Sequence, residues 1–196
     1  MKEHPILFSG PMVRAILEGS KTQTRRVVKP QPGNNFLSFG DLPTCTCHPF
    51  GFHDGERHWS SPYGAPGGQL WVRETWRKRA GLYYYAADFA PDDVAALKWK
   101  PSIHMRREAS RLALEVTEIR VERLQAISEE DASAEGVHRI KGAGGAVYPG
   151  TGAYRRPGSY RHAFQALWEQ INGKRTPWSS NPWVWVVSFR KMGGAE

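Results

Sequence analysis

The sequence predicts an α+β fold, a mixed β-barrel flanked by about three helices. Several segments of the 196-residue chain are apolar or alternate between apolar and polar residues, which is typical of strands. Others carry apolar residues at the spacing of an amphipathic helix. Strands and helices do not alternate regularly along the chain, and this argues against a parallel α/β sheet.

The chain begins with elements of both kinds. Residues 5–8 form a short apolar run that suits a buried strand. Residues 9–18 predict a helix, because Pro11 stands near its start and Gly19 follows where a C-cap glycine belongs. Residues 24–28 then predict a second strand.

The remaining strands and helices are expected further along the chain. Strand patterns occur at residues 70–76, 83–87, 112–124 and 182–189. In the longest of them the alternation breaks between Val116 and Ile119, which indicates a β-bulge. Helices are predicted at residues 128–135, after the capping-box-like Ser128, and at residues 160–171.

Two Gly- and Pro-rich segments interrupt this pattern, at residues 31–68 and 137–158. Neither shows a sustained period, and such long segments without periodicity tend to be functional loops. We therefore expect a single domain over residues 1–196, with these two segments as loop insertions.

The charge and hydropathy of the chain indicate which classes of partner it binds. A formal net charge of +8 favours phosphate-bearing partners, because basic side chains release counterions when they bind nucleic acid. Ordinary solubilising charge is the alternative. No apolar run approaches the roughly 20 residues of a membrane span, and the first residues lack the apolar core of a secretory signal. We expect a cytoplasmic protein that does not contact membranes.

The two cysteines, Cys45 and Cys47, are too close in sequence for an unstrained disulfide. Together with His48, and with His53 and His58 further on, they are weak candidates for zinc ligands. Their spacing departs from the usual C-x₂-C pair, so an unliganded loop is the favoured interpretation. No cofactor is expected.

A basic turn at residues 19–26, Gly-Ser-Lys-Thr-Gln-Thr-Arg-Arg, is the first candidate site. Lys21 could activate a nearby hydroxyl or bind an oxyanion there. A solvated basic turn is the alternative. The spacing is not that of a phosphate-binding P-loop.

Glu74 is the second candidate. It lies on the same side of its strand as the apolar Leu70 and Val72. A carboxylate in that position needs a cationic or hydrogen-bonding partner, or its pKa rises. We expect Lys21 to be this partner; the alternative is an ion pair with an arginine that only holds the strand in place.

Further residues are candidates for binding a substrate or nucleic acid: Arg25, Arg26, Arg73, Trp76 and His104. Aromatic side chains among arginines can stack on bases. Most of the aromatic residues are nevertheless expected in the core.

The motif Gly19-x-Lys21-x-x-Thr24-x-Arg26 resembles the signature G-x-K-x-x-E-x-R of ASCH domains, a branch of the PUA-like superfold. Residues 70–74 resemble the strand that follows this signature in ASCH domains, and residues 102–105 and 181–186 resemble segments of the longer, phage- and prophage-associated members. The resemblance implies a PUA-like barrel with a cleft beside the signature that accepts RNA or a modified base.

One ASCH branch consists of small amidohydrolases that remove acyl groups from N4-acetylcytidine with a lysine, a threonine and a glutamate. Lys21, Thr24 and Glu74 match these residues in type, order and spacing. The resemblance implies Thr24 as nucleophile, Lys21 as base and Glu74 as acid, acting on an N4-acylated cytidine. The alternatives are a non-catalytic RNA- or DNA-binding module that recognises a nucleobase, and an ASCH-type ribonuclease.

Overall fold

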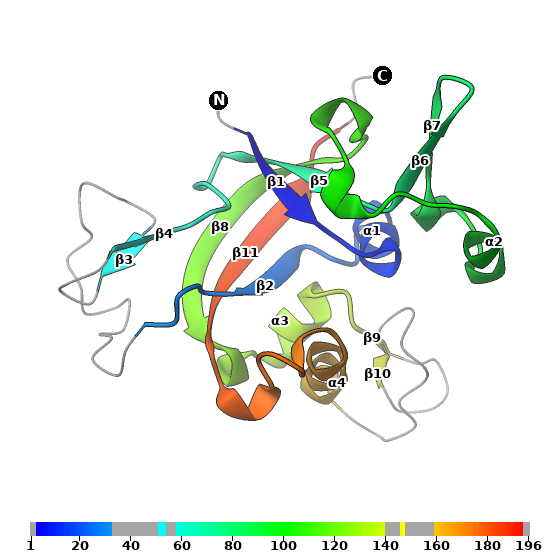
Figure 1. The fold of residues 1–196 in the computed structure, drawn as a ribbon. Coiled ribbons are helices and arrows are strands. Elements are labelled where there is room, and N and C mark those ends of the chain that lie inside the picture. The colour runs from blue at the N-terminus through cyan, green and yellow to red at the C-terminus, as the bar shows by residue number, and fades with distance from the viewer. Residues whose placement is uncertain (1–2, 33–50, 54–57, 140–145, 148–158, 194–196) are drawn as a thin grey trace.

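The computed structural model describes residues 3–32, 51–53, 58–139, 146–147 and 159–193 (Figure 1). A five-stranded sheet forms the body of this part of the chain, with the strand order β1-β5-β8-β11-β2. Its strands are β1 (Glu3–Leu7), β2 (Gln23–Val27), β5 (Gln69–Arg73), β8 (Ala113–Arg123) and β11 (Trp183–Lys191). Only the pair β1–β5 is parallel; the other neighbours in this sheet are antiparallel.

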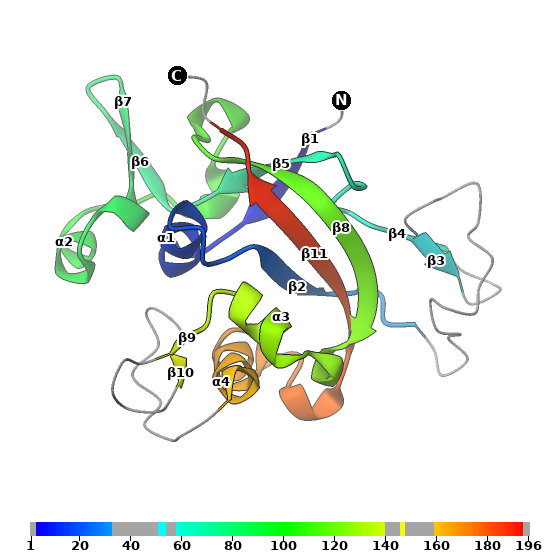
Figure 2. The ribbon, with the colours of Figure 1, turned by 180° about the vertical axis from the view of Figure 1, so that it is seen from behind.

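The sheet is strongly curved, because the long strands β8 and β11 bend around the body (Figures 1 and 2). The bulge predicted in β8 is confirmed. Ser188 pairs with Glu118 while the next residue, Phe189, pairs with Val116, so Thr117 has no partner. Such an extra residue increases the bend and twist of a strand.

Four α-helices accompany the sheet among the described residues: α1 (Gly10–Leu17), α2 (Pro91–Ala96), α3 (Glu129–Ala134) and α4 (Tyr160–Asn172). The three predicted helices correspond to α1, α3 and α4. The Ser128 side chain accepts a hydrogen bond from the backbone N–H of Asp131 and so caps α3. Short 3₁₀-helices are η1 (Ala86–Asp88), η2 (Ser102–His104), η3 (Arg107–Ala109), η4 (Leu124–Ala126) and η5 (Trp178–Ser180).

Three two-stranded pairs complete the described elements: β3 (Gly51–His53) with β4 (His58–Ser60), β6 (Trp76–Arg79) with β7 (Leu82–Tyr85), and β9 (His138–Arg139) with β10 (Ala146–Val147). Two of these pairs fall inside the segments expected to be loops. The expectation of loops was therefore wrong at these four short strands, whereas residues 31–32 and 61–68 lie in no strand or helix.

The core lies on both faces of β11. Trp185, Val187 and Phe189 pack on one face, in a cluster that includes side chains of α1, β1, β5 and β8. Val184 and Val186 pack on the other face, against α3 and α4. Met12 of α1 contacts both clusters, so the helices and the sheet are joined at the position where α1 meets β2.

The α+β class predicted from the sequence is confirmed. The described strands do not close into a barrel, because β1 and β2 remain the two edges of the curved sheet. No helix among the described residues is long and apolar enough to cross a membrane.

Candidate functional site

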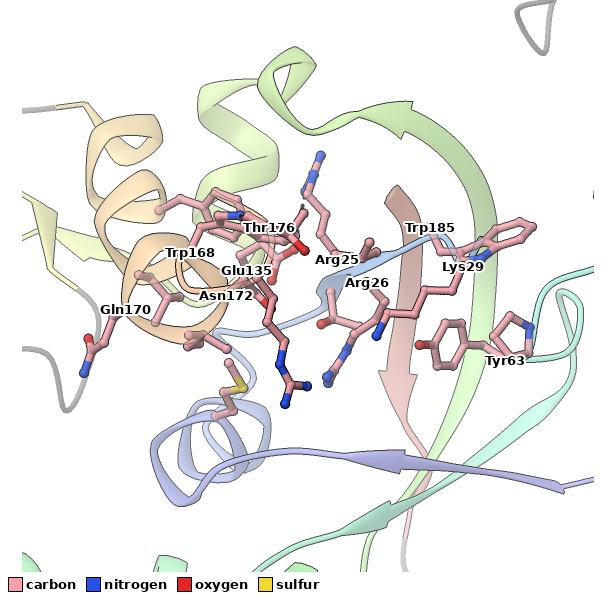
Figure 3. Close-up of a pocket in the computed structure, with 18 of the residues that line it drawn as sticks. Arg25, Arg26, Lys29, Tyr63, Glu135, Trp168, Gln170, Asn172, Thr176 and Trp185 are labelled. Carbon is pink, nitrogen blue, oxygen red and sulfur yellow. Dashed lines mark hydrogen bonds and ion pairs between the residues drawn. The ribbon is translucent and has the colours of Figure 1, made fainter. Parts of the chain in front are cut away.

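A cavity of about 830 Å³ lies between α4, strand β2 and residues 59–63 (Figure 3). Its basic lining residues are Arg25, Arg26, Lys29, Lys174 and Arg175. Its aromatic lining residues are Trp59, Tyr63, Phe164, Trp168 and Trp185. Glu135 is the one carboxylate that lines it among the described residues. The excess of positive charge makes the cavity attractive to anions, and the aromatic rings can pack against a flat ligand.

Lys21 lies at the back of this region, in the turn between α1 and β2, and is 1% exposed. Its ammonium donates to the carbonyl oxygens of Gln23 at 2.8 Å and Glu135 at 2.9 Å, and to Glu135 Oε2 at 2.7 Å. Three acceptors match the three protons of an ammonium group. Burial lowers the pKa of Lys21, and the Glu135 carboxylate opposes this shift.

Two glycines allow the chain to bring Lys21 and Glu135 together. Gly19 has φ +78 and ends α1, so the chain reverses before Lys21. Gly136 has φ +89, and a Cβ there would lie 3.1 Å from the Cβ of Lys21. Glycine at this position therefore lets the end of α3 approach the turn closely enough for the ion pair.

Thr24 lines the cavity from β2 and is 3% exposed. Its position in the sheet is fixed by pairing with Val187 of β11. Glu135 lines the same cavity from the end of α3. The structure thus brings Thr24 and Lys21 of the predicted set to one region, together with Glu135, which the sequence analysis did not propose as a site residue.

Glu74 is held elsewhere, so the expected pairing of Lys21 with Glu74 was wrong. Glu74 is 1% exposed and accepts hydrogen bonds from Arg111 Nε at 3.0 Å and Nη2 at 3.2 Å. Arg111 also binds Asp88 and lies 4.0 Å from the centre of the Tyr85 ring. Burial raises the pKa of Glu74, and Arg111 opposes the shift. Arg111 lies just before β8. Because β8 pairs with β5, and β5 ends next to Glu74, the arginine is brought to the carboxylate.

Arg25 lines the cavity, but its guanidinium already forms hydrogen bonds and ion pairs with other side chains. It donates to Gln23 Oε1 at 2.6 Å, to Asp131 at 2.6 Å and to Glu122 at 3.2 Å. Its side chain is fully buried. Arg25 therefore joins β2 to α3 and β8, while its expected role in binding a ligand stays a prediction.

Arg26 is more available to a ligand than Arg25. Its Nη2 donates to the carbonyl of Leu7 at 2.5 Å, and its guanidinium lies 5.2 Å from the centre of the Phe8 ring. Its Nε is buried and has no hydrogen-bond partner. Unlike Arg25, Arg26 is only half-buried and takes part in no ion pair among the described residues, so its guanidinium keeps donors for an anion or a polar ligand group.

The other predicted binding residues do not line the cavity. Arg73 donates to the carbonyl oxygens of Ser102 and Ile103 and so fixes η2 to the end of β5. Trp76 is buried in a separate small cluster with Met105. His104 is exposed in η2. These three residues belong to a different part of the molecule from Thr24 and Glu135.

The zinc candidates Cys45, Cys47 and His48 lie outside the described residues. Within the described ranges, no group of three or more His, Cys, Asp or Glu side chains is placed to hold a metal ion.

Local sequence signals for the missed site residues are weak. Glu135 stands directly before the helix-ending Gly136, but nothing in that pattern identifies its partner. Trp59 and Tyr63 are aromatic residues in a segment that otherwise has the composition of a loop. The cavity residues of α4 lie in a helix that was predicted, but its periodicity does not indicate which of its residues line a cavity.

No protein-family model, no curated protein and no solved structure matches this chain. Its function is therefore inferred from the cavity and the residues around it.

Proposed function

We propose that the chain is a nucleic-acid-binding module of the ASCH type, which holds a nucleobase of single-stranded RNA or DNA in the cavity between α4 and β2. The observation that carries the proposal is the lining of this cavity, in which basic and aromatic side chains accompany several hydroxyl groups and, among the described residues, one carboxylate. Single-stranded nucleic acids are bound by this combination of charge and aromatic surface. We also propose that the curved sheet is an open form of the PUA-like barrel.

The phosphate is assigned to the mouth of the cavity. Arg26, Lys29 and Tyr63 point into this space in Figure 3. Lys29 is exposed and takes part in none of the ion pairs among the described residues. Burial raises the pKa of Tyr63, so its hydroxyl stays neutral and can donate to a phosphate oxygen or a base.

The base is assigned to the inner part of the cavity. Tyr63 is half-buried and offers an aromatic surface at its side. Stacking of one base on an aromatic side chain contributes about 1–3 kcal/mol to binding. Thr24 and Glu135 supply a hydroxyl and a carboxylate oxygen, which can hydrogen-bond to the edge of the base.

A binding measurement tests this proposal. The double variant Arg26→Gln/Lys29→Gln is expected to bind a labelled single-stranded oligonucleotide about tenfold more weakly than the parent protein, because two phosphate contacts are lost. Its plot of log affinity against log salt concentration should be shallower by about 1.4, from roughly 0.7 per contact. Fluorescence anisotropy at several salt concentrations measures both quantities.

Lys191→Gln is the matched control, since Lys191 is exposed and forms no ion pair among the described residues. It should bind like the parent protein. The proposal fails if the parent protein binds neither RNA nor DNA, or if the double variant and the control bind equally well.

A second candidate is hydrolysis of an N4-acylated cytidine, with Glu135 in the role expected for Glu74. It is favoured by the presence of Thr24 and Glu135 in one cavity, with Lys21 2.7 Å from the carboxylate. In this scheme the Thr24 hydroxyl attacks the amide carbonyl carbon and passes its proton to Glu135. Glu135 then protonates the cytidine nitrogen as the C–N bond breaks, and water hydrolyses the acyl-threonine. Lys21, with its three protons already bonded, holds Glu135 in place.

Turnover distinguishes this candidate from binding alone. The parent protein should release cytidine from N4-acetylcytidine, measured by chromatography, and Thr24→Val and Glu135→Gln should each reduce the rate at least 100-fold, because each removes a group that acts in the reaction. Glu74→Gln should retain the activity, since Glu74 is bound to Arg111. Loss of activity only in the Glu74 variant would restore the assignment expected from the sequence, and no turnover by the parent protein would eliminate this candidate.

A further inference from the structure

The β6–β7 hairpin projects from the body beside α1 (Figures 1 and 2). Its two strands pair with each other and not with the five-stranded sheet. An isolated two-stranded hairpin is only marginally stable, so its base must be anchored. Two backbone hydrogen bonds between Trp76 and Lys100, of 3.2 and 2.7 Å, provide one anchor.

One face of the hairpin packs inward. Directly opposite residues of an antiparallel pair point to the same face, and Trp76 is opposite Tyr85. Trp76 is buried with Met105 and Ala109, and the Tyr85 hydroxyl donates to the carbonyl of Ala109 at 2.9 Å. This inner face accounts for the anchoring of the hairpin.

The other face, which we call the outer face, carries Arg77 opposite Tyr84 and Arg79 opposite Leu82. None of these four residues belongs to a buried cluster among the described residues. Leu82 is 62% exposed. The Arg77 guanidinium lies 6.0 Å from the centre of the Trp99 ring, which widens this face with a second aromatic side chain.

The two guanidinium groups of the outer face are free of carboxylates. Neither Arg77 nor Arg79 takes part in an ion pair among the described residues, and Asp92 and Asp93 of the neighbouring α2 pair with neither. By contrast, Arg120 of β8 and Arg190 of β11 are paired with glutamates. Alternation along β6 places Arg77 and Arg79 on the same side, where their charges repel each other unless an anion lies between them.

We infer that the outer face of the hairpin is a second binding surface, which contacts the backbone and one base of a single-stranded nucleic acid. Arg77 and Arg79 would each bind a phosphate, with the planar fork of donors that suits phosphate oxygens. Tyr84 lies across from Arg77 and would stack on a base. The inference rests on the proposed function, because it requires that the nucleic acid whose base fills the cavity also reaches the hairpin.

The test compares a long ligand with a short one. A single strand of about 30 nucleotides spans far more than the 4–16 nucleotides of a typical single-strand site, whereas a mononucleotide is too short to occupy both surfaces and is expected in the cavity, which has the larger lining. The double variant Arg77→Gln/Arg79→Gln should bind the long strand about tenfold more weakly, with a salt dependence shallower by about 1.4. Its affinity for the mononucleotide should not change. Tyr84→Ala should also weaken binding of the long strand. Tyr84→Phe should bind it like the parent protein, because the aromatic ring is kept.

Each outcome separates the hairpin from the cavity. If the hairpin variants bind the long strand like the Lys191→Gln control while the Arg26→Gln/Lys29→Gln variant loses affinity, the hairpin inference is overturned and the cavity proposal stands. If only the hairpin variants lose affinity, the cavity proposal is overturned, and so is the inference that one nucleic-acid strand occupies both surfaces. An equal loss of affinity for the long strand and the mononucleotide would indicate a change in fold and overturn the inference. A preference of the parent protein for duplex over single-stranded nucleic acid would also overturn it. If the parent protein binds no nucleic acid, both are overturned.

Discussion

Replacing Lys21 with methionine is expected to lower the free energy of unfolding by about 3–5 kcal/mol, the usual cost of removing one partner of a buried ion pair. The variant removes the closest cation of the buried Glu135 carboxylate and leaves it only the longer ion pair with Arg25, at 3.5 Å. It also removes the donor to the carbonyl oxygens of Gln23 and Glu135. Urea unfolding followed by circular dichroism measures the change.

Two further variants identify the cause of this loss. Lys29→Met replaces an exposed lysine and should change the unfolding free energy by no more than about 0.5 kcal/mol. The double variant Lys21→Met/Glu135→Gln should recover part of the stability, because the buried carboxylate that lost its lysine is replaced by a neutral amide. A loss below about 1 kcal/mol in Lys21→Met would mean that the pair contributes no more than an exposed one.

Replacing Arg25 with methionine should destabilise the fold by a similar amount, about 3–5 kcal/mol. The substitution leaves Asp131 and Glu122 close together with one cation fewer between them, although Arg120 still contacts both. Their mutual repulsion adds to the loss of the hydrogen bond to Gln23 Oε1. Urea unfolding of the variant without ligand measures the effect.

The control for Arg25 is Arg190→Met, which breaks an exposed pair with Glu115. Exposed pairs contribute about 0–1 kcal/mol, so this variant should remain close to the parent protein in stability. If Arg25→Met folds as stably as Arg190→Met, the guanidinium is not a structural element and becomes available again as a ligand-binding group in the cavity.

Much of the fold could be predicted because its elements carry local patterns. The strand at residues 112–124 and its bulge follow from the alternation of Leu114, Val116 and Ile119, and β8 has this form. The helix α2 was missed although it begins at Pro91 with acidic residues in its first turn, because it is short and has little apolar periodicity. Strand β6 was missed because the strand predicted at residues 70–76 ended at Trp76, the first residue of β6, whereas Glu74 and Thr75 separate β5 from β6.

The candidate site was harder to predict than the fold, since its contacts are distant in sequence. Lys21 and Thr24 could be selected from a short motif. The partner of Lys21 is Glu135, 114 residues away, and the choice of Glu135 over Glu74 depends on which elements the topology brings to the turn. Burial of a charged side chain indicates that a partner exists, but only the arrangement of α3 against β2 identifies it.

The position of β11 has a consequence for how the chain folds during synthesis. This strand comes from residues 183–191 but lies between β8 and β2, and both core clusters depend on its side chains. A nascent chain that has not yet reached these residues exposes the unpaired edges of β2 and β8. Such edges pair readily with other chains, so newly made protein needs protection until the strand emerges from the ribosome.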